Sequence, residues 1–139
     1  NGNAAHIAAL TEFANAIGVA FQIQDDLLDA TADNEKFGKT VGGDIVEGKK
    51  TYLILRALDK VQNPADSALL EKFVRNTGLT RDEVPLMQEL FERNGIFGEA
   101  QADIERLTDR AHTALDALPA SEARTMLHWF ANMLLEREH

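Results

Sequence analysis

The sequence of 139 residues has no cysteine, only three prolines and few aromatic side chains, which make up 6% of its residues. Without cysteine the chain has no disulfide framework and no thiolate metal site. This composition is compatible with the reducing cytoplasm, where we expect the protein to reside. No run of about 18 apolar residues predicts a membrane span, and the first residues do not form a secretory signal.

Basic residues are also scarce. Lys and Arg number 14 against 23 Asp and Glu, which gives a formal charge of −9 at pH 7. This balance excludes a general nucleic-acid binder, because phosphate backbones are held by clustered basic side chains. An anionic ligand would therefore need lysines placed locally. The length suits one domain that buries roughly two thirds of its unfolded surface.

Apolar residues recur at steps of three and four along most of the chain, and no strand pattern of any length interrupts them. The sequence therefore predicts an all-α helical bundle of about six helices. Glycine and short polar residues replace the periodicity between positions 31 and 48, and long loops of this kind inside a compact domain are usually functional or disordered. The expected helices cover about 4–30, 49–58, 64–77, 80–93, 96–118 and 122–137.

Three carboxylates interrupt the first predicted helix in the pattern DDxxD, formed by Asp25, Asp26 and Asp29. At 3.6 residues per turn, Gly18, Gln22, Asp25 and Asp29 fall in one line, with Asp26 at its edge. Carboxylates on successive turns can reach one hard cation, and Mg²⁺ is typically shared between such carboxylates and substrate phosphates. The alternative is an acidic patch at an exposed helix end. The apolar flanks favour the cation; they include Phe21, Ile23, Leu27 and Leu28.

The loop supplies positive charge directly after glycine. Lys39 follows Gly38, and Lys49 and Lys50 follow Gly48. Glycine lets the backbone approach a ligand closely, and lysine neutralises phosphate as a point charge. Solvated loop lysines are the alternative interpretation. The short separation between these lysines and the aspartates favours a diphosphate site.

Two segments resemble known binding motifs but lack residues that those motifs require. The segment 43–49 has the spacing of a phosphate-binding P-loop, but Lys50 stands where Ser or Thr should bind Mg²⁺, and no strand precedes it. A calcium-binding loop that starts at Asp29 has Asn34 in place of the required glycine, and one that starts at Asp33 places Phe37 at a ligand position.

The four histidines have no second histidine three or four positions away, so we expect helix-surface or capping roles for His6, His112, His128 and His139. Trp129 and Phe130 lie on the last predicted helix. We expect this pair to pack that helix into the core or against a partner.

About a dozen positions resemble, in order and spacing, the second aspartate-rich motif and following loop of the trans-polyprenyl diphosphate synthases, which include the farnesyl and geranylgeranyl diphosphate synthases. These positions are Gly18-x-x-Phe21-Gln22-x-x-Asp25-Asp26-x-x-Asp29, Gly38-Lys39, Gly42-x-Asp44 and Gly48-Lys49-x-Thr51. The resemblance implies an isoprenoid synthase fold, in which two aspartate-rich helices face each other across a cavity. In that family Mg²⁺ ions hold an allylic diphosphate, which ionises and is attacked by isopentenyl diphosphate.

The resemblance also implies roles for individual residues. Asp25 would bind Mg²⁺ directly, and Asp26 and Asp29 would bind it directly or through metal-bound water. Contacts to the allylic diphosphate would come from Gln22, Lys39 and Lys49, and Phe21 would help to line the cavity.

The match covers only about the C-terminal half of such an enzyme, since no second DDxxD and no basic site for isopentenyl diphosphate precede it. We therefore expect residues 1–139 to be the C-terminal part of a synthase domain, inactive alone, whose exposed apolar helix favours a homo-oligomer or association with the missing N-terminal half. One alternative is a non-catalytic helical module that binds diphosphate or needs a partner chain. Another is a structural domain whose acidic stripe is incidental.

Overall fold

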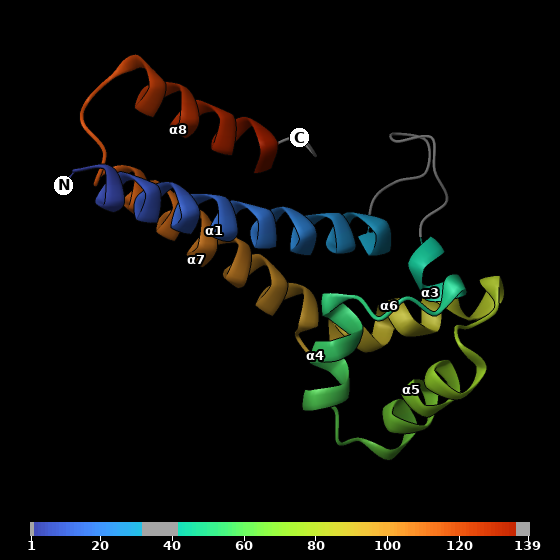
Figure 1. The fold of residues 1–139 in the computed structure, drawn as a ribbon. Coiled ribbons are helices and arrows are strands. Elements are labelled where there is room, and N and C mark those ends of the chain that lie inside the picture. The colour runs from blue at the N-terminus through green and yellow to red at the C-terminus, as the bar shows by residue number, and fades with distance from the viewer. Residues whose placement is uncertain (1, 32–41, 136–139) are drawn as a thin grey trace. The chain divides into compact units, whose positions relative to one another are not determined.

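The computed structural model describes residues 2–31 and 42–135, and all of its regular elements in those ranges are helices (Figure 1). The predicted all-α fold is thereby confirmed. Within the described ranges there are seven α-helices rather than about six, because the loop contains a short one. The elements are α1 (Gly2–Thr31), α3 (Gly43–Glu47), α4 (Tyr52–Lys60), α5 (Pro64–Asn76), the 3-10 helix η1 (Arg81–Glu83), α6 (Val84–Arg93), α7 (Ile96–Leu115) and α8 (Glu122–Leu135).

The chain divides into two compact units. One comprises the residues up to Gln24 together with those from Gln101 onward, and the other comprises Asp25–Ala100. Helices α1 and α7 contribute to both units. All three aspartates of the DDxxD pattern, α3 and α4 belong to the second unit, which therefore contains the candidate site.

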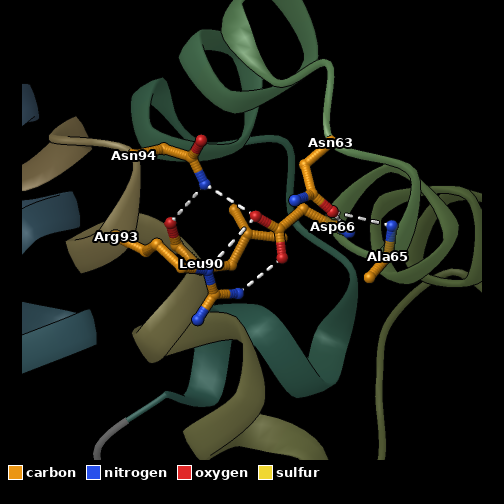
Figure 2. Close-up of polar contacts among 6 residues, drawn as sticks. All are labelled: Asn63, Ala65, Asp66, Leu90, Arg93 and Asn94. Carbon is orange, nitrogen blue, oxygen red and sulfur yellow. Dashed lines mark hydrogen bonds and ion pairs between the residues drawn. The ribbon is translucent and has the colours of Figure 1, made fainter.

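Helix α5 begins as the sequence predicts. The side-chain oxygen of Asn63 accepts hydrogen bonds from the backbone N–H groups of Ala65 at 2.8 Å and Asp66 at 3.3 Å, and Pro64 occupies the first helical position. Proline suits this position because its missing N–H has no partner inside the helix. Figure 2 shows this cap beside the carboxylate of Asp66.

Asp66 joins the start of α5 to the end of α6. Its side chain is 5% exposed, and its carboxylate accepts hydrogen bonds from the Arg93 guanidinium and, at 3.0 Å, from the Asn94 amide (Figure 2). The same amide donates to the carbonyl of Leu90 at 2.8 Å. The hydrogen bond from Arg93 is the main reason why the pKa of Asp66 lies below its ordinary value.

Helix α6 buries the face that the sequence predicts. Val84, Met87, Leu90 and Phe91 are all at most 4% exposed. The expected start near Thr80 is a capping box, in which the Thr80 and Glu83 side chains bond to each other's backbone N–H groups around η1.

Helix α8 contacts its neighbours through few large apolar side chains. Of its residues only Ala131 and Leu135 are buried, whereas Trp129 is 60% and Phe130 40% exposed. The expectation that these two aromatic residues pack into the core was therefore wrong; packing against a partner stays a prediction. The end of α8 is held instead by a hydrogen bond from the buried Gln24 side chain to the Leu135 carbonyl, at 2.7 Å.

Polar contacts also join α8 to α7. The Nδ1 atoms of His112 and His128 lie 2.6 Å apart, and His112 Nε2 lies 2.9 Å from the side-chain oxygen of Asn132. The sequence did not predict this pair because its members are 16 residues apart on different helices.

Helix α1 exposes the large apolar side chains of Ile7, Leu10 and Val19, as expected for the first helix. Its residues Ala4–Thr31 are long and apolar enough to cross a membrane by length and composition, with a mean hydropathy of 1.3 in the relevant window. The sequence-based expectation rested on the lack of an uninterrupted apolar run, which this criterion does not require, so the absence of a membrane span stays a prediction. Core helices of globular proteins satisfy the same criterion, so length and hydropathy decide nothing further.

Candidate functional site

The three aspartates of the DDxxD pattern differ in exposure. Asp26 is 4% exposed, whereas Asp25 and Asp29 are half-buried. Earlier on the same helix, Phe21 is half-buried and Gln22 is exposed. The helical line drawn from the sequence therefore corresponds to the more accessible side of α1, and Asp26 lies inward from it.

Asp26 binds the start of α4. Its Oδ2 atom accepts a hydrogen bond from the backbone N–H of Tyr52 at 3.0 Å, although the two residues are 26 positions apart. Tyr52 is the first residue of α4, and the Thr51 side chain caps the same helix by accepting from Ile54 N–H at 3.3 Å. Together, Asp26 and Thr51 satisfy two N–H groups that an isolated helix end would leave to water.

Asp29 binds the start of α3 in a similar way. Its Oδ2 atom accepts from the backbone N–H of Asp44 at 3.0 Å, and its own carbonyl accepts from Gly42 N–H at 2.7 Å. Two carboxylates of one motif thus cap the two helices that follow it. The sequence predicted a loop over 31–48, and Gly43–Glu47 corrects it, because glycines on both sides hid a helix of five residues.

Lys49 lies between two carboxylates. Its ammonium nitrogen is 4.0 Å from Asp26 Oδ1 and 3.9 Å from Asp44 Oδ2. Burial raises the pKa of Asp44 above its ordinary value, and the negative charge of Asp29 raises it further, while Lys49 opposes both effects. Two carboxylates thus face one ammonium group, so the charge of these three side chains is negative.

Glycine positions Lys49. Gly48 has a φ of +78° and lies against the turn at Thr77, where a Cβ atom on Gly48 would be 2.4 Å from the Thr77 carbonyl oxygen. Leu79 N–H also donates to the Ile45 carbonyl at 3.1 Å, which fastens this turn to α3. The positive φ and the close contact with Thr77 therefore require glycine at position 48, directly before Lys49.

The structure brings together four of the residues on which the sequence analysis concentrated, namely Asp26, Asp29, Asp44 and Lys49. Asp44 is part of the sequence motif, but no role was predicted for it. Lys39 lies outside the described residues. Among the residues that are described, no three acidic or histidine side chains form a group that could hold a metal ion.

An aspartate-rich helix end next to a glycine–lysine segment, within an all-α fold, is the arrangement that the resemblance to the polyprenyl diphosphate synthases predicts. A geranylgeranyl pyrophosphate synthase from Corynebacterium glutamicum, solved in complex with isoprenyl diphosphate and magnesium, shares this fold with a TM-score of 0.83 and 31% identity; the similarity covers 94% of this chain and 37% of that one. Residues 1–91 match the family described as polyprenyl synthetase. The chain belongs to that family.

Two curated relatives agree with this assignment. A short chain isoprenyl diphosphate synthase from Methanothermobacter thermautotrophicus is 38% identical over 99% of this chain and 42% of its own length. Heptaprenyl diphosphate synthase component 2 from Bacillus subtilis is 33% identical over 94% of this chain and 36% of its own length. The chain spans about two fifths of the length of these relatives.

Proposed function

We propose that this chain is the C-terminal part of a cytoplasmic, Mg²⁺-dependent polyprenyl diphosphate synthase, which condenses isopentenyl diphosphate head-to-tail with an allylic diphosphate. The observation that carries the proposal is the cluster of Asp26, Asp29, Asp44 and Lys49, in which the Lys49 ammonium group faces Asp26 and Asp44, and Asp29 accepts a hydrogen bond from Asp44 N–H. The family match supports the reaction class.

The donor set fits Mg²⁺. Carboxylate oxygens are the hard ligands that this ion prefers, and it usually takes only one or two of them, with water and substrate phosphates as the others. Half-buried Asp25 and Asp29 suit that role. A bound Mg²⁺ would stabilise the negative charge that develops on a departing diphosphate.

The remaining roles follow from the resemblance and from position. Lys49 would contact the allylic diphosphate, because its half-exposed ammonium group can reach an anion while it faces Asp26 and Asp44. A cation fixed before the reaction stabilises developing charge without reorganisation. The resemblance assigns Gln22 and Lys39 to the same diphosphate and Phe21 to the cavity wall.

A second candidate is a non-catalytic chain that acts only with a partner. The observation in its favour is that one relative of similar coverage is named as component 2 of a heptaprenyl diphosphate synthase. Under either proposal the chain would associate, as a homo-oligomer or with an N-terminal half, and the exposed Ile7, Leu10 and Val19 side chains favour association.

The test is a condensation assay with isopentenyl and allylic diphosphates in three arms. These are the chain alone, the chain mixed with the N-terminal part of the Methanothermobacter relative, and that N-terminal part alone. We expect product only from the mixture with Mg²⁺, and loss of product with Asp25→Ala. Turnover by the chain alone at ordinary enzyme rates would contradict the proposal that it is an incomplete synthase.

A further inference from the structure

Asp26 differs from its two motif partners in its surroundings. Its carboxylate is 4% exposed, and both oxygens face groups of the protein: Oδ2 accepts from Tyr52 N–H at 3.0 Å, and Oδ1 faces the Lys49 ammonium group at 4.0 Å. Asp29 also accepts a backbone N–H at a helix start, from Asp44 at 3.0 Å, but no ammonium group of the described residues lies within 4.0 Å of it. Both Asp25 and Asp29 are only half-buried. The family resemblance implies a metal-binding role for all three residues, but only Asp26 is buried.

Lys49 and Tyr52, two partners of Asp26, belong to one short stretch of chain. Lys49 lies three residues before Tyr52, and Thr51 between them caps α4. A carboxylate at a helix N-terminus is stabilised by the unpaired N–H groups and by the helix dipole. A metal ion bound through Oδ1 would lie against the Lys49 ammonium group and be repelled by it, and one bound through Oδ2 would share that oxygen with the Tyr52 N–H.

We infer that Asp26 is a positioning residue, which fastens the start of α4 through Tyr52 N–H and thereby holds the Lys49 ammonium group at the diphosphate site, and that Asp25 and Asp29 supply the direct carboxylate ligands. This inference rests on the proposed function. Its physical basis is that a lysine side chain has many rotamers, and a nearby fixed carboxylate restricts them.

If Asp26 is a positioning residue, a substitution there should change the affinity for diphosphate but not the affinity for the metal ion. Asp26→Asn keeps an oxygen that can accept from Tyr52 N–H and removes the charge that faces Lys49. We expect it to weaken diphosphate binding by about tenfold, the effect of losing one charge-assisted contact. We expect the affinity for the metal alone to change by less than about twofold.

The experiment uses the 139-residue chain and calorimetry with two probes. The first probe is Mn²⁺, which shares the oxygen-ligand preference of Mg²⁺; the second is inorganic diphosphate at saturating Mg²⁺. Asp25→Asn and Asp29→Asn should reduce Mn²⁺ affinity by at least about tenfold, unlike Asp26→Asn. A loss of Mn²⁺ affinity with Asp26→Asn equal to that with Asp25→Asn would overturn the inference.

A double-mutant cycle separates positioning from a general structural role. Asp26→Asn and Lys49→Met should together weaken diphosphate binding no more than Lys49→Met alone, because Asp26 acts through that lysine. Additive effects would mean that Asp26 does not act through Lys49, and would contradict the inference.

A second readout does not depend on ligands. Hydrogen exchange at the Tyr52 amide should accelerate at least about tenfold in Asp26→Ala and stay unchanged in Asp25→Ala. If the unmodified chain binds neither probe, the proposed function fails, and this exchange measurement still decides whether Asp26 fastens α4. Equal exchange in both variants would overturn the positioning role.

Discussion

A Cβ atom on Gly48 would lie 2.4 Å from the carbonyl oxygen of Thr77, and Gly48 itself has a φ of +78°. A larger residue here must both adopt an unfavourable backbone conformation and displace the turn at Thr77. We predict that Gly48→Ala lowers the free energy of unfolding by about 3 kcal/mol, as measured by urea denaturation.

Gly98→Ala is the matched control for that variant. Gly98 lies within α7, where an added Cβ would meet nothing within 4 Å. Because alanine is the better helix former, we predict a gain of about 0.5–1 kcal/mol. Equal effects of the two substitutions would mean that Gly48 is not required by its contact with Thr77.

The Asp66 carboxylate is predicted to be a main support of the second unit. Asp66→Ala removes the acceptor for Arg93 and Asn94, and should lower the free energy of unfolding by about 2 kcal/mol. Arg106→Ala is the control. It breaks an exposed ion pair with Asp103 within α7 and should change the free energy of unfolding by less than about 0.5 kcal/mol. Thermal denaturation of both variants checks the contrast, and a harmless Asp66→Ala would disprove the role.

The lowered pKa of Glu83 predicts that the stability of the fold depends on pH in the acidic range. The Lys72 ammonium group, followed by the backbone and side chain of Thr80, lowers the pKa of Glu83 from 4.5 to about 2. A lowered folded-state pKa stabilises the fold above the unfolded pKa, and this contribution is lost as pH falls from about 4.5 to about 2. Urea midpoints should therefore fall less steeply over this range in Glu83→Gln than in the unmodified chain. If the urea midpoints of the two proteins fall in parallel with pH, the ionisation of Glu83 does not cause the loss of stability in acid.

His112 and His128 meet edge to edge. Their ring planes are inclined by 5°, and their Nδ1 atoms are 2.6 Å apart. Since the separation of two nearly parallel planes cannot exceed the distance between an atom of one and an atom of the other, the rings are too close for face-to-face stacking, which needs about 3.5 Å. One Nδ1–H therefore donates to the other Nδ1. Because α8 buries only Ala131 and Leu135, this bond should contribute strongly to its attachment.

We predict that His128→Phe accelerates amide hydrogen exchange throughout α8, because phenylalanine cannot make the bond to His112. Trp129→Phe, on the exposed side of the same helix, should leave that exchange unchanged. Mass spectrometry of the exchanged chain measures both. If the two variants behave alike, α8 is held by other contacts.

Patterns that depend on neighbouring residues could be predicted from the sequence. The Asn63–Pro64 start of α5 needs only a local cap, and the buried face of α6 follows from helical spacing. The DDxxD pattern and the glycine–lysine segment were likewise sufficient to indicate the family, because their spacing is itself the signal.

Features that depend on distant contacts could not be predicted in this way. The inward position of Asp26 is set by Tyr52, 26 residues later, and the His112–His128 contact joins two helices. The exposure of Trp129 had no sequence signal, since an apolar stripe looks the same whether it faces a core or a partner.

We propose that the aspartates at the end of α1 and Lys49 form a magnesium-dependent diphosphate site. Calorimetric titration of inorganic diphosphate into the chain, with and without Mg²⁺, tests it most directly. We expect binding that requires Mg²⁺ and is lost in Asp25→Ala. Binding that is equal without Mg²⁺ and survives Asp25→Ala would contradict this proposal.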